Sequence, residues 1–453
     1  MTQKLVVVGG IAAGLSAASK AKRLLPGLRV TVYEKSGYVS TGACGLPYFV
    51  GGSVREARDL LSLSKEDLQG RRGITVKTAH EVLSIDPASK TVEALDLENG
   101  ARISDSYDDL VIATGASPIR PPLPNVGAQG VFYLRTLEDG IALRAAAQSG
   151  VKRAVIVGGG LIGLESAEQL AQTGISVTVV EAMSSLLPIL NDEDAESVRQ
   201  ELIKHGVEVE LNARAEEVLT QDGKAAGLRL SNGKELRAEI ILMSIGVKPN
   251  TELASRCGVE LGERGAIVTD NRMRTNVPSV WACGDCAESH HRITGMPCWI
   301  PSGTTANKQG RVAGSNIGGE AVTFPGVLGS QVTKVFDLYA AATGLSLKKA
   351  LEAGFDARST SIIKSDKASY YPGGVDSRVT LVYERCGGRI LGAQAIGGIS
   401  VAGRVNLLVA AITAGMTVSQ LNDLDLLYSP AVAPVYDPLL IAAAQAIKQV
   451  VAE

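Results

Sequence analysis

Residues 4–34 read KLVVVGGIAAGLSAASKAKRLLPGLRVTVYE, and this stretch decides the fold. The apolar run 4–8 predicts a buried parallel strand, and the glycine-rich turn after it leads into a predicted helix over 13–25. A second predicted strand, 30–33, ends at Glu34. A strand, a glycine turn, a helix and a strand that ends in an acid are typical of a βαβ unit that binds a dinucleotide.

The first turn carries a degenerate version of the glycine fingerprint. Gly9 permits a tight turn, Gly14 permits close helix packing, and the amides at the helix N-terminus would face a pyrophosphate. Ile11 stands where the middle glycine is usual, so this motif is weak by itself. The Glu34 carboxylate can accept hydrogen bonds from ribose hydroxyls. The candidate cofactor residues are Gly9, Gly10, Ala13, Gly14, Glu34 and Lys35.

The same order of elements recurs later in the chain. A predicted strand at 153–157 precedes the turn GGGLIG at 158–163, which has all three glycines. A predicted helix over 161–172 and a strand over 176–180 follow, and the strand again ends in an acid. Two fingerprints weigh strongly against unrelated glycine-rich turns. The candidate residues are Gly158, Gly160, Leu161, Ile162, Gly163 and Glu181.

Glu181 predicts which nicotinamide cofactor binds the second fingerprint. A carboxylate at this position accepts a free 2′-hydroxyl and repels a 2′-phosphate. The next residues, 182–185, include no arginine or lysine to receive such a phosphate. We therefore expect NADH to be preferred over NADPH.

Composition excludes several classes of protein. The 453 residues are enough for two or three domains, and the formal charge of −2 predicts neither nucleic-acid nor acidic-membrane binding. Six cysteines are too few for a disulfide scaffold. The apolar segment 407–411 is too short to span a membrane, and the apolar N-terminus is interpreted as a strand and not as a signal peptide. We expect a cytoplasmic protein with no membrane partner.

Further turns between and after the fingerprints supply cofactor candidates. Residues 109–118, which read DLVIATGASP, predict a strand followed by a turn. The proline-rich segment 119–124, which reads IRPPLP, predicts a crossing between domains. A return crossing is expected at 240–250 (IILMSIGVKPN). Residues 278–288 read PSVWACGDCAE, and the aspartate of this segment could reach a ribityl chain. Residues 299–311 should begin a helix whose N-terminus faces a flavin ring. The candidates are Thr114, Gly115, Gly246, Gly284, Asp285, Thr304, Thr305 and Ala306.

Cys44 lies at the centre of residues 39–52, which read VSTGACGLPYFVGG. The fifth residue after it is Phe49, so no C-x4-C dithiol is present. A lone thiolate can cycle only through a sulfenic acid or a mixed disulfide with a small thiol. We expect helix dipoles and a flavin to lower its pKa. The alternative, a small buried apolar residue, fits this position between a fingerprint and Leu46-Pro47-Tyr48 less well.

The other cysteines are predicted to be structural, and no metal site is predicted. Cys283 and Cys286 form a C-x2-C pair, but no second pair stands at zinc spacing. Cys257, Cys298 and Cys386 have no supporting context and are assigned to packing.

Taken together, these motifs resemble the FAD-dependent pyridine nucleotide-disulfide oxidoreductases. The resemblance rests on the two fingerprints, the Ala-Thr-Gly turn, the Gly-Asp motif and the single cysteine in CGLPY. The single cysteine indicates the branch of the family that contains coenzyme A-disulfide reductase, NADH oxidase and polysulfide reductase. The resemblance implies an α/β fold with two Rossmann-like domains and a C-terminal α+β dimerisation domain. The implied boundaries are 1–116 and 247–322 for the FAD domain, 117–246 for the NAD(P) domain and 323–453 for dimerisation.

The resemblance also implies a dimer with shared active sites. Residues 359–363, 377–383 and 389–395 predict a mainly antiparallel sheet, and 400–414 and 438–450 predict helices. Tyr370-Tyr371-Pro372-Gly373 and Leu427-Tyr428-Ser429-Pro430 resemble segments that in this family cross the dimer interface to the partner's cysteine. The candidate proton donors are Tyr370, Tyr371 and Tyr428.

The implied activity is transfer of hydride from NAD(P)H through FAD to Cys44, which reduces coenzyme A disulfide or a related disulfide, persulfide or polysulfide. Alternatives are an NADH oxidase that reduces oxygen and a signalling flavoprotein that responds to NADH. Ala12 stands where the oxidases and peroxidases of this branch carry a histidine, and Ala43 where the disulfide reductases carry an asparagine. For coenzyme A, a further expected ligand, the candidates are Lys20, Arg23, Ser40 and Arg72, with Arg71 a looser one.

Overall fold

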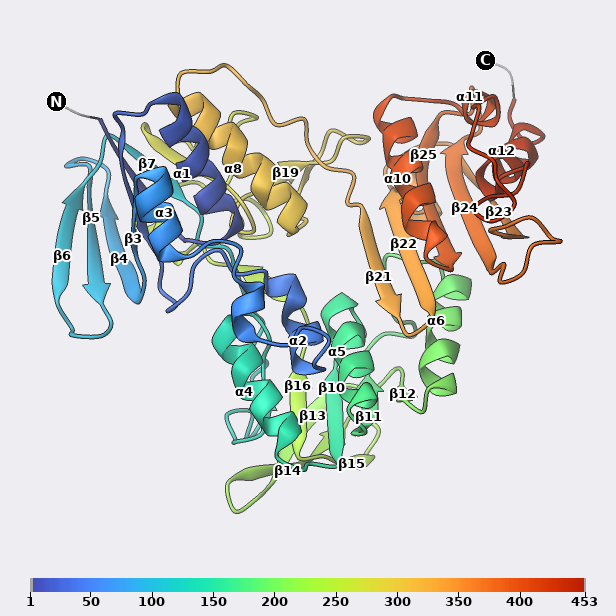
Figure 1. The fold of residues 1–453 in the computed structure, drawn as a ribbon, viewed down its shortest axis with the longest axis horizontal. Helices are drawn as coiled ribbons and strands as arrows, with labels where there is room; N and C mark the ends of the chain where they lie inside the picture. The colour runs from blue at the N-terminus through green and yellow to red at the C-terminus, as the bar shows by residue number, and fades with distance from the viewer. Residues whose placement is uncertain (1–2, 452–453) are drawn as a thin grey trace.

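The computed structural model describes residues 3–451, and they form three units (Figure 1). The N-terminal unit has a parallel five-stranded sheet built from two separate stretches of the chain. Its strand order is β18 (Val280–Ala282), β7 (Asp109–Ile112), β1 (Lys4–Val8), β2 (Arg29–Tyr33) and β3 (Ile74–Lys77). An antiparallel sheet of β4 (His80–Asp86), β5 (Thr91–Asp96) and β6 (Arg102–Ser106) extends this unit.

Helix α1 (Ala12–Leu24) packs closely on α8 (Gly303–Ile317), which comes from the later stretch. Two glycines of α8 make this approach possible. A Cβ added at Gly310 would lie 2.2 Å from the Ala13 carbonyl oxygen, and one at Gly314 would lie 2.3 Å from that of Ala17. The two stretches of the N-terminal unit are therefore joined backbone to backbone.

The second unit repeats the parallel βαβ arrangement in one continuous stretch. Its strand order is β12 (Glu208–Glu210), β11 (Ser176–Val180), β10 (Arg153–Val157), β16 (Ile240–Met243) and β9 (Val131–Phe132). The helices are α4 (Leu137–Gln148), α5 (Leu161–Gln172) and α6 (Asp192–Lys204), and a small antiparallel sheet holds β13 (Ala215–Gln221), β14 (Lys224–Leu230) and β15 (Glu235–Arg237).

The two chain crossings between these units run side by side. Strand β8 (Ala116–Pro118) pairs antiparallel with β17 (Val247–Pro249). These segments adjoin the two crossings that the proline-rich and Gly-Val-Lys-Pro stretches predict. The domain boundaries themselves stay a prediction.

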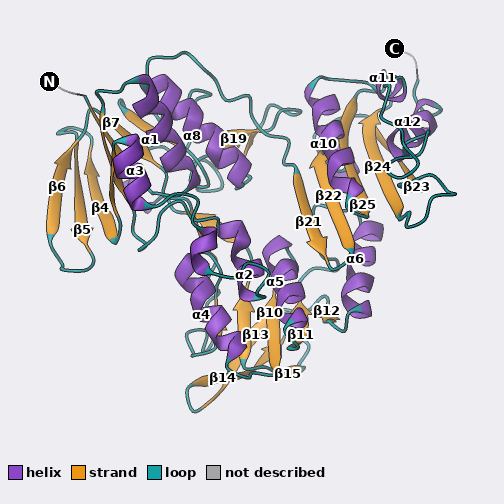
Figure 2. Cartoon of the chain, viewed as in Figure 1, coloured by secondary structure: helices purple, strands orange, loops and turns teal. Residues whose placement is uncertain are grey.

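The third unit is an antiparallel sheet with helices on it (Figure 2). Its order is β21 (Gln331–Val335), β22 (Leu338–Gly344), β25 (Ile390–Gly397), β24 (Asp376–Glu384) and β23 (Ala357–Ser365). Helices α10 (Ser400–Thr413) and α12 (Pro438–Ile447) pack on this sheet. The predicted fold class, α/β with two dinucleotide-binding sheets and an α+β C-terminal unit, is confirmed. The strands run longer than predicted because β-hairpin pairing continues into polar residues such as Lys364.

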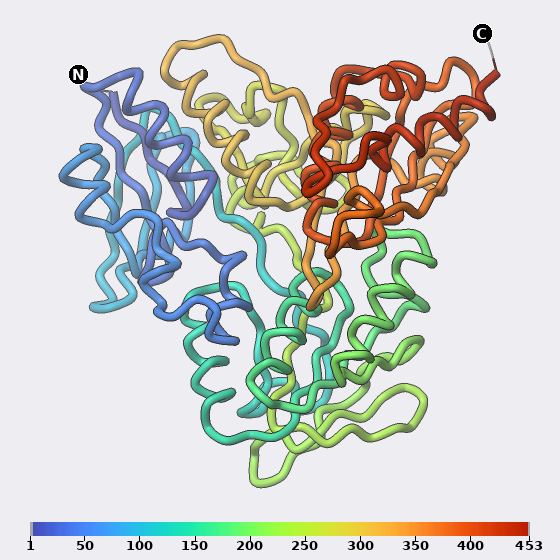
Figure 3. The backbone as a smooth tube through the Cα atoms, turned by 45° about the vertical axis from the view of Figure 1, so that its right-hand side comes forward, coloured from blue at the N-terminus to red at the C-terminus, as the bar shows by residue number. Residues whose placement is uncertain are grey.

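Helix α2 (Leu46–Val50) belongs to the N-terminal stretch but packs on the second unit, against α4 and α5. Leu46 and Phe49 are buried in the same core as α5 and β10. Val335 and Phe336, from the β21–β22 hairpin of the third unit, enter that core from another side. The turned view shows α6 directly beneath the third unit (Figure 3). All three units thus meet around α5.

Candidate functional site

The first fingerprint turn fits a dinucleotide. Gly9 has φ +111°, and a Cβ on Gly14 would lie 1.9 Å from the Gly9 carbonyl oxygen, so both positions require glycine. The Gly10 N–H donates to Glu34 Oε2 at 2.7 Å, and Ser36 N–H donates to Oε1 at 2.9 Å. The strand-end acid is thereby fixed beside the turn.

The second turn has nearly the same geometry. Gly158 has φ +112°, and a Cβ on Gly163 would lie 2.0 Å from the Gly158 oxygen. Glu181 accepts hydrogen bonds from Gly159 N–H at 2.7 Å and Met183 N–H at 2.8 Å. A Cβ at Gly160 would meet nothing within 4 Å, which leaves room for a phosphate at the start of α5. Leu161 and Ile162 form the first turn of that helix.

Three stretches that are distant in sequence converge on the first fingerprint. A Cβ added at Gly284 would lie 2.7 Å from Ala13 Cβ and 3.7 Å from Ala306 Cβ. Gly284 N–H donates to Gln309 Oε1 of α8 at 2.8 Å. Thr304, Thr305 and Ala306 lie in the first turn of α8. The Gly-Asp motif, the first turn and the α8 N-terminus thus form one cradle, which fits FAD.

The other predicted cofactor residues lie at the crossings or are engaged in other contacts. Thr114 Oγ1 donates to Asn250 O at 2.6 Å, Gly115 has φ +69° and Gly246 has φ +109°. The exposed Lys35 forms an ion pair with Glu81 at 2.8 Å. Their roles toward a cofactor stay predictions.

Asp285 forms an ion pair with Arg135 at 3.0 Å, so its carboxylate is already engaged by the residues that lead into α4. The predicted contact of Asp285 with a ribityl chain would have to share this carboxylate with the guanidinium. Sequence reasoning missed Arg135, because the pairing joins residues 150 positions apart.

Cys44 is an exposed free thiol in the short 3-10 turn Ala43–Gly45, directly before α2. Its pKa is raised, first because the surrounding loop desolvates it and next because Glu165 is close; Arg135 acts in the opposite direction. Helix dipoles and a flavin, which we expect to lower this pKa, are not among these causes, so that expectation stays a prediction.

Glu165 and Tyr48 are two ionisable side chains of this region that sequence reasoning did not single out. Glu165 accepts hydrogen bonds from Thr333 Oγ1 at 3.3 Å and from Tyr48. Burial raises the Glu165 pKa to about 7, and burial and Glu165 raise the Tyr48 pKa to about 12. The sequence does contain one signal for Glu165, because this residue stands two positions after Gly163 on a helix that must begin at the cofactor. Its contact across units could not be inferred.

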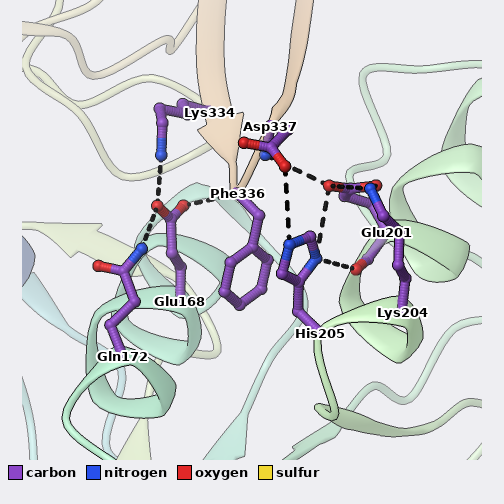
Figure 4. Close-up of polar contacts among 8 residues, drawn as sticks. All are labelled: Glu168, Gln172, Glu201, Lys204, His205, Lys334, Phe336 and Asp337. Atoms are coloured by element: carbon purple, nitrogen blue, oxygen red, sulfur yellow. Dashed lines mark hydrogen bonds and ion pairs between the residues drawn. The ribbon is translucent and has the colours of Figure 1, made fainter.

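The β21–β22 hairpin is clamped onto α5 and α6 (Figure 4). The buried Glu168 pairs with Lys334 and accepts the Phe336 N–H at 2.9 Å. The His205 ring stacks on Phe336 with centroids 4.0 Å apart, and its Nε2 lies 3.7 Å from Asp337 Oδ2. Donor atoms of Glu201, His205 and Asp337 lie within 4.8 Å of one another, so the prediction of no metal stays untested.

The structure brings together two of the three candidate tyrosines. Tyr370 Oη and Tyr428 Oη lie 3.0 Å apart, and this hydrogen bond raises the Tyr370 pKa. Tyr371 instead packs its ring under Lys367, whose Nζ is 5.8 Å from the ring centroid. The loop between β23 and β24 projects at the right-hand edge of Figure 1, well away from α2. Within one chain, these tyrosines do not serve Cys44.

Two of the basic candidates for coenzyme A, Lys20 and Arg23, lie on α1, and the third, Arg72, contacts this helix. Arg72 donates to Ser19 Oγ of α1 at 3.0 Å, and Arg23 is exposed on the same helix. Lys20 forms an ion pair with Glu320 at 3.0 Å. Ser40 has φ +55° in the loop before Cys44.

Comparison with known proteins establishes the class. The pyridine nucleotide-disulphide oxidoreductase family model matches residues 3–310, and the dimerisation-domain model of that family matches residues 330–438. The chain belongs to the pyridine nucleotide-disulphide oxidoreductases, flavoenzymes that use FAD and NAD(P)H.

Particular relatives are similar to nearly the whole of this chain. The NAD(P)H coenzyme A polysulfide/persulfide reductase of Pyrococcus horikoshii is 38% identical, with 98% of each chain covered. An NADH oxidase of Methanocaldococcus jannaschii is 34% identical over 98% of this chain and 99% of its own. The structure of a NAD-dependent persulfide reductase from A. fulgidus superimposes with a TM-score of 0.96 at 40% identity, covering 98% of this chain and 83% of that chain. Within residues 3–451, no helix is long and apolar enough to cross a membrane.

Proposed function

We propose that this flavoenzyme uses Cys44 to reduce a small disulfide, persulfide or polysulfide, with coenzyme A as the preferred thiol carrier. The observation that carries the proposal is the placement of one exposed thiol where α2 of the N-terminal unit meets α5 of the nicotinamide-binding unit. A relative named as a coenzyme A polysulfide/persulfide reductase supports the substrate class.

The residues of the chain have separate tasks. The two glycine turns and their strand-end acids orient two dinucleotides. FAD, when bound, passes the hydride equivalent from NADH to sulfur. Cys44 attacks the substrate sulfur as a thiolate and forms a mixed disulfide, because no second thiol is positioned locally to form an internal one. Lys20, Arg23, Ser40 and Arg72 are proposed to bind the coenzyme A phosphates. Arg72, the last residue of α3 (Lys65–Arg72), contacts Ser19 of α1, the helix that also contains Lys20 and Arg23.

Intact mass under non-reducing conditions tests this assignment. The protein is incubated with coenzyme A disulfide and then digested to locate any adduct. One coenzyme A per chain on Cys44, removed by NADH, is expected. An adduct on exposed Cys386 alone, or none with full turnover, contradicts it.

A second candidate function is reduction of oxygen, which the NADH oxidase relative favours. In that case Cys44 would act only after oxygen has reacted at the flavin. Oxygen uptake with NADH alone, measured against turnover of coenzyme A disulfide without oxygen, separates the two. We expect the disulfide reaction to be faster.

We also propose a homodimer with shared sites. The match to a dimerisation domain supports it, as do apolar side chains that the third unit leaves exposed. Leu427, which precedes Tyr428 in the sequence, is 91% exposed, and Tyr436 is 74% exposed. Neutral tyrosines there would donate protons to the partner's departing thiolate.

Subunit mixing tests the shared site. Chains of Cys44→Ser and chains of Tyr428→Phe, each inactive, are allowed to exchange. One hybrid site then pairs an intact cysteine with an intact tyrosine, and activity should partly return. Confirmed exchange with no return of activity contradicts the shared site. A cytoplasmic location, proposed because six cysteines in 453 residues are too few for a disulfide scaffold, is consistent with this thiol chemistry.

A further inference from the structure

Two loops of the third unit carry the hydrogen-bonded tyrosines. The first tyrosine loop, residues 366–375, joins β23 to β24 and contains Tyr370. The second tyrosine loop, residues 423–437, joins α11 (Val418–Asn422) to α12 and contains Tyr428. The loops meet where Tyr370 Oη lies 3.0 Å from Tyr428 Oη and where Ala368 N–H donates to Pro430 O at 3.4 Å. Both tyrosines are about half exposed or more, so these two contacts are too weak to fix the hydroxyls by themselves.

One buried guanidinium joins the ends of both loops. Arg404 on α10 donates from Nε to the two carboxylate oxygens of Asp437, at 3.1 and 3.0 Å, and from Nη2 to Asp437 Oδ2 at 2.7 Å. The same Nη2 donates to the Asp366 carbonyl oxygen at 3.3 Å. Asp437 is the last residue of the second tyrosine loop, and Asp366 is the first residue of the first one. Helix α10 therefore holds both loops through a single side chain.

Each aspartate fixes the segment to which it belongs. Asp437 Oδ1 accepts the Leu439 N–H at 2.9 Å and so caps α12. Asp366 Oδ1 accepts the Val375 N–H at 2.9 Å, which closes the first tyrosine loop at its two ends. Asp366 Oδ2 accepts the Ser400 hydroxyl of α10, also at 2.9 Å. Both aspartates are buried, as is Arg404, so this network is shielded from water.

Stability alone does not account for the buried ion pair. Arg404 Nη1 is buried as well and has no hydrogen-bond partner within residues 3–451. The cost of removing two charges from water offsets most of their attraction, and an unpaired buried donor adds to that cost. What the pair does secure is the relative position of two segments that lie more than 50 residues apart in the sequence.

We propose that Arg404 is the positioning residue for the Tyr370–Tyr428 pair, with Asp437 as its counter-ion. The guanidinium holds the two loops together, so that the two hydroxyls reach the thiol of a second copy of this chain as one hydrogen-bonded unit. Its planar set of donors serves the carboxylate and the carbonyl at the same time, which a lysine ammonium cannot do in the same geometry. This inference rests on the shared site of the proposed function.

A double variant, Arg404→Met with Asp437→Asn, separates positioning from stability. It removes both buried charges at once, so neither is left unpaired, and asparagine keeps the α12 cap. In the full-length flavoprotein we expect NADH to reduce the flavin as in the wild type. The KM for coenzyme A disulfide should stay near the wild-type value, whereas kcat should fall by about tenfold or more, because the proton donors are misplaced.

Hydrogen exchange followed by peptide mass gives a readout that does not depend on activity. Exchange in the double variant should be faster in residues 366–375 and 423–437 and unaltered in β21 and β22, because only the two loops are released. Faster exchange throughout the third unit, or no change in either loop, overturns the proposal.

Subunit mixing shows on which chain Arg404 acts. Chains of the double variant keep Cys44, so exchange with Cys44→Ser chains should give more activity than either parent. Exchange with Tyr428→Phe chains should give no gain, because neither chain then supplies a positioned tyrosine pair. The opposite pattern would mean that Arg404 acts on the thiol of its own chain, and it overturns the proposal.

Two further variants keep the test decisive. Arg389→Met, which removes an exposed two-bond pair with Glu384 in the same unit, should match the wild type in exchange and in kcat. If the double variant loses its flavin, Asp437→Asn alone replaces it and should show the same two released loops. Released loops together with a fully active Tyr428→Phe leave the positioning by Arg404 intact and remove only the proposed shared site.

Discussion

The two dinucleotide-binding units have the same turn but different surroundings. In both, the first glycine has φ near +111°, the last glycine meets the carbonyl of the first, and an amide donates to the strand-end glutamate at 2.7 Å. The helices that follow differ. Helix α1 is covered by α8 at backbone contact, whereas α5 packs on α2 through apolar side chains and meets the β21–β22 hairpin through the carboxylate of Glu168.

This difference shows how one motif serves two tasks. A helix locked between two stretches of chain suits a cofactor that stays bound through many turnovers. A helix with carboxylates toward its neighbours can take part in proton chemistry while its own cofactor exchanges. The fingerprint determines what kind of ligand binds, and the packing partner of the helix determines what happens beside it.

The largest expected effect comes from breaking each turn separately. Gly14→Val should yield protein without FAD and without activity, because its Cβ would meet the Gly9 oxygen at 1.9 Å. Gly163→Val should retain FAD but lose reduction of the flavin by NADH. Flavin absorbance and anaerobic NADH titration measure both. Gly403→Ala, where a Cβ meets nothing within 4 Å, serves as the control and should change neither. If Gly14→Val and Gly163→Val lost flavin equally, the two turns could not be assigned to different cofactors.

Next in size is the choice of nicotinamide. With Glu181 beside the second turn, kcat/KM for NADH should exceed that for NADPH by about 10- to 100-fold, from repulsion of the 2′-phosphate. Glu181→Gln should lower this ratio of kcat/KM for NADH to kcat/KM for NADPH by about tenfold. Glu34→Gln, the equivalent change at the first turn, should leave the ratio unaltered. A wild-type ratio near one places Glu181 away from the adenosine ribose.

The clamp on α5 should contribute to stability. Lys334→Met leaves the buried Glu168 with only the Phe336 amide as a partner outside its own helix, at a cost of about 1–3 kcal/mol in the free energy of unfolding. Lys204→Met, which removes an exposed partner of Glu201, should cost less than about 1 kcal/mol. Urea midpoints of the two flavoproteins compare them. Equal losses would mean that burial of Glu168 has no effect.

An effect of similar size is expected in the dependence of stability on pH. The pKa of Glu165 is raised from 4.5 to about 7 on folding. Between these values the unfolded chain has released the proton and the folded chain keeps it, so the free energy of unfolding falls as pH rises. The wild type should lose about 2 kcal/mol over this window relative to Glu165→Gln, after allowance for partial exposure. Urea unfolding at pH 5 and pH 8 measures the difference. If the free energy of unfolding falls equally in the wild type and in Glu165→Gln, groups other than Glu165 cause the pH dependence.

Sequence reasoning succeeded where function depends on local order. The strand, the glycine turn, the helix and the closing Glu34 or Glu181 lie within one short stretch, so spacing alone locates them. It also identified Cys44 as an isolated cysteine, because Phe49 stands where a C-x4-C motif would have its second cysteine.

It failed where chemistry depends on contacts between units. The pairs Glu165–Thr333, Glu168–Lys334 and Arg135–Asp285 join residues more than 100 positions apart, and each charged side chain taken alone resembles ordinary surface charge. The raised pKa of Cys44 was missed for the same reason, since its main charged neighbour arrives from another unit.

The central claim is that electrons leave the flavin through Cys44, and anaerobic half-reactions of Cys44→Ser test it most directly. The variant is reduced with one equivalent of NADH and then mixed with coenzyme A disulfide while flavin absorbance is followed. The account predicts reduction by NADH as in the wild type and no reoxidation by the disulfide, whereas oxygen still reoxidises the flavin. Reoxidation by the disulfide at the wild-type rate, with flavin fully bound, would contradict the claim.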